Sequence, residues 1–107
     1  MADQETLRWI NQEQQQMRKE GWTPDSRKVT WLIGQWRNLT PETHKRLRRE
    51  GRLRKTAEVC LFKVDQTETE LLKSGMPRTD AREQAEREWL LLEEDEEMED
   101  EELALGQ

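Results

Sequence analysis

The residues most able to do chemistry stand in one basic stretch in the middle of the chain. Positions 39–55 have the sequence LTPETHKRLRREGRLRK, with seven cations in the last eleven positions. Arginines on one helix face suit phosphates and other oxyanions, because a guanidinium donates paired hydrogen bonds to them. We therefore predict that an acidic partner or a phosphate contacts Lys45, Arg46, Arg48, Arg49, Arg52, Arg54 and Lys55.

Three interpretations of this basic stretch remain open. It binds nucleic acid, it binds an acidic protein, or it is a solvated helix face whose counterions are Glu42, Glu50 and the acidic tail. A short helix, a turn and a longer helix loosely resemble the order of a helix-turn-helix. No aromatic side chain lies within 40–55 to stack on bases, so we favour the protein contact or the solvated face over nucleic acid.

A run of acids near the C-terminus is the second charged feature. Residues 1–76 carry a net charge of +4 and residues 77–107 a net charge of −10. The acidic run mimics nucleic acid toward a basic partner, shields the basic stretch of its own chain, or keeps the protein soluble. Its nine acids in ten positions are Glu93, Glu94, Asp95, Glu96, Glu97, Glu99, Asp100, Glu101 and Glu102.

The sequence contains few residues suited to catalysis or to metal binding. Cys60 is the only cysteine and His44 the only histidine, whereas metal sites need several such ligands. Cys60 falls on an apolar helix face, where a buried and inert thiol is the usual explanation. Glycine-rich phosphate loops and nucleophile motifs are absent from the sequence. We expect a protein that is not an enzyme and that holds no cofactor and no metal.

The apolar residues predict a folded chain with a small core. Leu, Ile, Val and Phe make up only 19 of 107 residues, and charged residues make up 39%. Five tryptophans compensate in part, because each ring can bury a large apolar area. Trp36 and Trp89 fit apolar helix faces and are expected to pack. For the off-face Trp9, Trp22 and Trp31, packing and partner contact are equally plausible roles.

Five helices are expected to position these residues, over about 3–19, 24–38, 41–50, 52–73 and from Asp80 into the acidic run. Thr-Pro pairs at 23–24 and 40–41 predict helix starts, because threonine caps and proline suits the first turn. Asp80 with Glu83 resembles a capping box at the start of the last helix. Gly21, Gly51 and Gly75 each follow a helical segment, where a C-terminal cap is expected.

The fourth helix carries a heptad-like seam of apolar residues. The seam faces either the chain's own bundle, which is the default, or another copy in a homo-oligomer. We predict an all-α fold, a small bundle of four to five helices with a helical hairpin over about 52–92. Residues 1–92 form one domain, and residues 93–107 form an acidic C-terminal tail that could extend the last helix. The seam residues are Leu53, Ala57, Cys60, Val64 and Leu71.

These features predict a helical interaction protein: an adaptor, an inhibitor or a structural component of a larger assembly. Its size and charge are of the type found in accessory proteins of phages and other mobile elements. A protein is the favoured partner. The alternatives are a regulator that binds nucleic acid through residues 44–55 and a nucleic-acid mimic that acts through the tail. One cysteine fits a reducing, cytoplasmic setting, and no apolar run approaches the ~20 residues of a membrane span.

Overall fold

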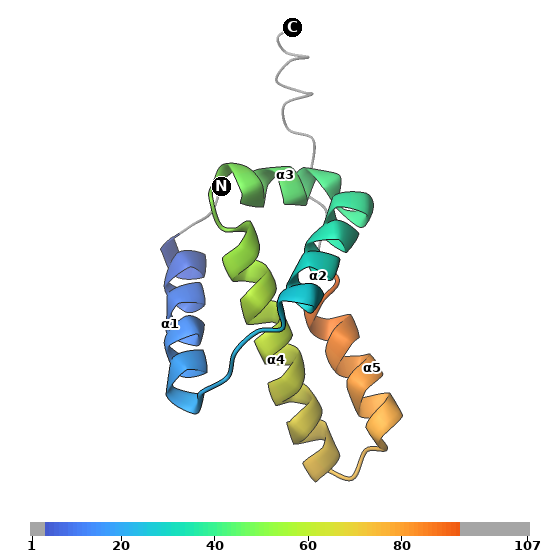
Figure 1. Cartoon of the computed structure of the whole chain (residues 1–107). Helices are drawn as coiled ribbons and strands as arrows, with labels where there is room; N and C mark the ends of the chain where they lie inside the picture. The colour runs from blue at the N-terminus through green and yellow to red at the C-terminus, as the bar shows by residue number, and fades with distance from the viewer. Residues whose placement is uncertain (1–3, 93–107) are drawn as a thin grey trace, which may run out of the picture.

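The computed structural model describes residues 4–92, with side chains from residue 7 onward, and this part of the chain is all-α. The acidic run 93–102 and the predicted extension of the last helix into it lie outside the described residues. No strand occurs within residues 4–92, as expected (Figure 1). The five helices are α1 (Gln4–Glu20), α2 (Ser26–Leu39), α3 (Pro41–Arg49), α4 (Leu53–Lys73) and α5 (Arg78–Trp89).

The longest helix, α4, lies at the centre of the arrangement. The other four helices all contact it, with α1 and α5 on opposite sides and α3 across the end where α4 begins (Figure 1). Helices α4 and α5 form an antiparallel hairpin, which confirms the prediction from the short connection between them. None of the helices within residues 4–92 is long and apolar enough to span a bilayer.

Two apolar clusters meet on α4. On one face, Ala57, Cys60 and Val64 pack with Leu32 and Trp36 of α2 and with residues of α5. Four of the five predicted seam residues therefore pack inside their own chain, with Leu53 half-buried at the edge of this cluster. The fifth, Leu71, is half-buried and belongs to neither cluster. On the other face, Val59 and Phe62 pack with Ile10 and Met17 of α1. Because both faces are used, α4 has apolar residues around much of its circumference.

Three helices end in the same way, at the three predicted glycines. Gly21, Gly51 and Gly75 all have positive φ, between 69° and 101°, which side chains other than glycine's rarely adopt. At each end the residue after the glycine donates its backbone N–H to a carbonyl five residues back, as Arg52 does to Leu47 at 2.9 Å. These are Schellman motifs, and they reverse the chain in very few residues.

Two predicted helix starts are displaced in the structure. The second helix begins at Ser26 instead of near Pro24, because the carboxylate of Asp25, rather than Thr23, caps it by accepting the N–H of Arg27 at 2.9 Å. The last helix begins at Arg78, with Pro77 as its N-cap. Asp80 therefore lies inside the first turn, where its charge favours the helix dipole, and it does not act as a cap.

Candidate interaction surface at the basic corner

The short helix α3 exposes its cations because it has one large apolar residue to bury. Leu47 packs into the core, and Thr43 and His44 are buried beside it. Positions 45, 48 and 49 then fall on the opposite side of the helix, where Lys45, Arg48 and Arg49 are exposed. Burial of Leu47 therefore orients α3 so that its cations point to solvent, where they can attract an acidic partner.

Arg52 departs from the predicted surface. It was expected beside Arg48 and Arg49 on one exposed face, but it is only 6% exposed. Its Nη2 lies 2.7 Å from Oε1 of Glu50, and that same oxygen lies 3.5 Å from Nη1 of Arg46. Gly51 turns the chain back at this point, which directs the Arg52 side chain inward against the end of α3. Arg52 therefore stabilises the turn and is not available as a surface contact.

Arg46 is half-buried beside Glu50, and the other five cations of the stretch stay at the surface. Lys45 and Arg54 form ion pairs with Glu42 and Glu58, and both side chains are more than half exposed, at 67% and 58%. Exposed pairs of this kind contribute about 0–1 kcal/mol and open readily. Three further side chains have no ion pair or hydrogen bond to residues 7–92: Arg48, Arg49 and Lys55. We call the five exposed cations the basic corner: Lys45, Arg48, Arg49, Arg54 and Lys55.

His44 is buried beneath this surface, and the charges that act on it include a further cation, Arg37. Burial lowers the pKa of His44, and the charges of Arg37 and Arg48 lower it further. The imidazole is therefore neutral at neutral pH and packs as a core residue. The two arginines that act on it come from the end of α2 and from α3, so Arg37 belongs to the same electropositive region. Sequence analysis missed Arg37, although its place in the last turn before Thr40 was a usable signal.

Charge is strongly divided within the described residues. Residues 26–55, which form α2, α3 and the start of α4, carry ten cations and two acids, a net charge of +8. Residues 56–92 carry five cations and eight acids, a net charge of −3. The basic corner therefore lies within a segment of strongly positive net charge, and residues 56–92 have a negative net charge. Such a division favours attraction of a negatively charged partner to one end of the molecule.

Among the tryptophans predicted at an interface, Trp31 has the most exposed side chain. It is 54% exposed and projects from the side of α2 opposite the buried Val29, Leu32 and Trp36. No contact within residues 7–92 explains an aromatic residue at this position. Tryptophan and arginine are the residue types most enriched at binding hot spots. Trp31 therefore remains a candidate for partner contact on the same electropositive segment as the basic corner.

Trp9 and Trp22 have contacts within the chain that account for their positions. The ring of Trp9 stacks on Trp89, with centroids 6.1 Å apart and planes 9° from parallel. Trp22 packs against Phe62 at 5.2 Å between centroids. Both are half-buried, and both join helices that are distant in sequence. Packing is the role that these contacts support, in place of the alternative role in partner contact.

The stacked pair is part of a cluster that joins α1, α4 and α5. The ammonium of Lys63 lies 5.5 Å from the ring centroid of Trp89 and 3.3 Å from a carboxylate oxygen of Glu13. The indole N–H of Trp89 donates to the hydroxyl of Thr67 at 2.8 Å. These contacts hold the end of α5 and the middle of α1 against the same stretch of α4.

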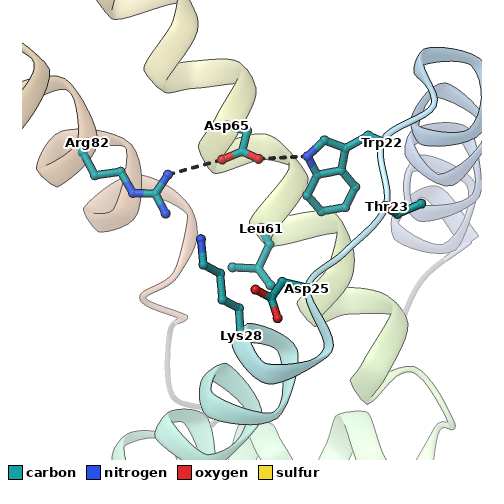
Figure 2. Close-up of a pocket in the computed structure, with 7 residues that line it drawn as sticks. All are labelled: Trp22, Thr23, Asp25, Lys28, Leu61, Asp65 and Arg82. Atoms are coloured by element: carbon teal, nitrogen blue, oxygen red, sulfur yellow. Dashed lines mark hydrogen bonds and ion pairs between the residues drawn. The ribbon is translucent and has the colours of Figure 1, made fainter.

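A small polar hollow lies between the 21–25 connection, the start of α2, α4 and α5 (Figure 2). Its volume is about 90 Å³, smaller than the ≈300–1,000 Å³ of ordinary ligand pockets. In Figure 2 the carboxylate of Asp65 is bonded on one side to the indole N–H of Trp22, at 2.8 Å, and on the other to Arg82, at 3.3 Å. Three of its polar side chains are thus bonded to one another, and together they form a structural joint.

Arg82 is the centre of that joint. Its guanidinium also donates to Glu68 at 3.0 Å and to Glu86 at 2.9 Å, so three carboxylates surround one cation. Burial opposes its charge, but the bonds to Glu68 and Glu86 outweigh that effect and raise the pKa of Arg82. Sequence analysis did not single out Arg82, because its partners lie on two helices and no local pattern marks them.

Cys60 has no feature of a reactive thiol. It is buried in the apolar cluster, and burial raises its pKa to about 12, so the thiolate is scarce at any physiological pH. Its position agrees with the buried, inert thiol expected from the sequence. In the part of the chain with described side chains, no three His, Cys, Asp or Glu residues are grouped as metal ligands.

Comparison with known proteins finds no matching family model, no matching curated protein and no matching solved structure. The functional argument therefore rests on the geometry and charge of this chain.

Proposed function

We propose that this chain is a non-enzymatic interaction protein that docks an acidic segment of a partner protein on the basic corner. The observation that carries the proposal is the set of cations Arg48, Arg49 and Lys55, exposed and without ion pairs to residues 7–92. Arginine binds a carboxylate in a defined orientation, because its guanidinium donates two parallel hydrogen bonds to the two oxygens. Trp31, on the same electropositive segment, would supply apolar contact area to such a partner.

Carboxylates interspersed among these cations favour a protein partner over nucleic acid. Glu42, Glu50 and Glu58 each pair with a cation at or beside the corner, so the surface has mixed charge. A rigid duplex holds its phosphates at a fixed spacing and cannot turn them away from these three side chains. A protein segment can turn in the backbone, so it can place its acids against Arg48 and Arg49 and keep them away from the three carboxylates. The surface also lacks an aromatic residue within 40–55 on which bases could stack.

The test is capture of the partner by the full chain and by two matched charge-reversed variants. Arg48→Glu/Arg49→Glu reverses two exposed cations in the last turn of α3. Arg18→Glu/Lys19→Glu makes the same change in the last turn of α1, with the same cost against the helix dipole. We expect the first variant to lose, and the second to keep, a protein captured from nuclease-treated host extract. Equal capture by both variants would place the binding surface elsewhere.

Duplex nucleic acid is the second candidate, and the net charge of +8 over residues 26–55 favours it. Its signature is a steep salt dependence. If Arg48, Arg49 and Lys55 each neutralise one phosphate, log K falls against log salt with a slope of about −3. Arg48→Glu/Arg49→Glu would then reduce the slope to about −1 or abolish binding. Binding of duplex DNA with this slope, together with capture that is lost on nuclease treatment, would replace the protein proposal.

A further inference from the structure

The end of the described chain lies close to the electropositive segment. The indole N–H of Trp36 donates to the backbone carbonyl of Leu90 at 2.8 Å, in a buried hydrogen bond. Leu90 is itself buried, and Leu92 packs against the same core cluster. Trp36 is one helical turn before Thr40, at which α2 meets α3. The described chain therefore ends beside the last turns of α2, near the α2–α3 junction.

The sequence that follows this point is the acidic run. Nine of the ten residues 93–102 are Asp or Glu, and they follow Leu92 directly. Ten residues reach up to about 33–36 Å when extended, and a nine-residue helix such as α3 is about 13.5 Å long. The tether is thus long enough for the acids to reach every part of α3. The net charge of −3 on residues 56–92 disfavours the opposite direction, toward the hairpin.

We infer that the acidic run 93–102 occupies the basic corner of its own chain and that a partner must displace it. This inference rests on the proposed function, since it concerns the regulation of the same surface. A short tether gives the acids an effective concentration in the millimolar range, so contacts that are weak individually suffice. If the run covers the corner half of the time, the apparent Kd of a competing acidic partner is doubled. The tail is then a built-in competitor that sets a threshold for binding.

Paramagnetic broadening in the full chain tests the contact directly. A nitroxide is attached to the new cysteine of Met98→Cys. The label reacts at this position because the thiol of Cys60 is buried. We expect the label to broaden backbone amide signals of α3 at low salt. The broadening should vanish at 1 M salt, where the screening length is only ~3 Å. It should also vanish with Arg48→Glu/Arg49→Glu and persist with Arg18→Glu/Lys19→Glu. Amides around Gly75, at the far turn of the hairpin, are the internal reference.

Two outcomes of the labelling experiment would overturn the inference. One is the absence of broadening at α3, or equal broadening at α3 and at Gly75. The other is broadening that occurs between chains and not within one chain. It is detected by mixing chains that carry the nitroxide but no ¹⁵N with chains that carry ¹⁵N but no nitroxide. That result would place the tail of a second copy on the corner.

Binding of a polyglutamate peptide separates failure of the inference from failure of the proposed function. The comparison uses the full chain and a full-length variant in which the nine acids of 93–102 become Gln or Asn. We expect the neutral-tail variant to bind the peptide at least about twofold more tightly at low salt. Equal affinity would overturn the inference and leave the proposed function standing. If neither form binds the peptide, the proposed function fails, while the labelling result still reports on the tail.

Discussion

In the α4–α5 hairpin the guanidinium of Arg82 contacts three carboxylates, whereas at the basic corner Arg48 and Arg49 contact none among the described residues. Both regions are rich in charge, and both belong to one small molecule. They differ in whether the charged side chains pair with one another. In the hairpin, charges join helices that are apart in sequence. At the corner, exposed cations surround one buried leucine.

This difference separates structural charge from charge that is available for binding. Arg82 and Asp65 form a network that fixes α5 and the 21–25 connection to α4. Moving either group would break several hydrogen bonds. Arg48 and Arg49 can move without such a loss, because their side chains bond to nothing else within residues 7–92. In a marginal fold, uncommitted cations grouped at one end are better explained by an external or tethered anion than by stability.

Both regions depend on the same core, so the largest effect is expected from its largest buried ring. Trp36→Ala should lower the free energy of unfolding by about 3–5 kcal/mol, through lost packing and the lost bond to Leu90. Trp31→Ala, on the same helix, should change it by no more than about 0.5 kcal/mol. Urea denaturation followed by circular dichroism measures both. If Trp36→Ala does not fold, Trp36→Phe keeps much of the packing and should cost less. Equal costs at the two positions would contradict the packing described for α2.

The next effect tests the hairpin side of the comparison. Arg82→Met leaves Asp65, Glu68 and Glu86 near one another without their cation, which should destabilise the fold by about 1–3 kcal/mol. Arg48→Met at the corner removes no ion pair to a described residue and should cost less than about 0.5 kcal/mol. The measurement is the urea midpoint of each variant at low salt. A larger cost at Arg48 than at Arg82 would reverse the assignment of structural and available charge.

A smaller effect concerns the turn that shapes the basic corner. Gly51→Ala adds a side chain at a φ of +70° and should cost about 1–2 kcal/mol, because left-handed backbone disfavours a Cβ. Gly34→Ala adds the same methyl group inside α2, where the new Cβ meets no atom within 4 Å. It should stabilise the protein by about 0.5–1 kcal/mol. Thermal melts of the two variants should move in opposite directions. Movement in the same direction would show that the positive φ at Gly51 does not control the turn.

The smallest effect is a dependence of stability on pH at the corner. The folded state takes up a proton on His44 less readily than the unfolded chain does, since burial, Arg37 and Arg48 lower its pKa. In the unfolded chain His44 keeps its ordinary pKa of about 6.5, so below that pH the unfolded state binds more protons than the folded state does. The free energy of unfolding therefore decreases as the pH falls below about 6.5. Urea titrations at pH 7.5 and pH 5.5 should show a smaller difference for His44→Gln than for the unaltered chain. An unchanged difference would mean that His44 does not titrate differently on folding.

Local features of the fold could be predicted from the sequence. The five helices, the glycine-terminated ends and the burial of Trp36 follow from periodicity and turn chemistry, which act over a few residues. The N-caps Asp25 and Pro77 were harder to predict, because several residues nearby could serve as caps and the rest of the fold selects among them.

The candidate surface was predicted in part. The exposure of Lys45, Arg48 and Arg49 followed from Leu47 being the one large apolar residue of α3. The burial of Arg52 did not follow, because it depends on how the turn at Gly51 directs the side chain against Glu50. Arg82 pairs with carboxylates up to 17 positions away on two helices, and Asp65 bonds to Trp22 across 43 positions. Long-range pairing of this kind leaves no local pattern in a chain so rich in charge.

The packing of α1 on α4 also has a consequence during synthesis on the ribosome. The buried partners of Ile10 and Met17 outside α1 are Val59 and Phe62, far along the chain. At about 5–20 residues per second, α1 waits on the order of several seconds before Phe62 has been added. By contrast, α5 meets α4 across a short turn and can pair with it as soon as it emerges. The nascent chain therefore carries the apolar face of α1 uncovered by α4 during this interval.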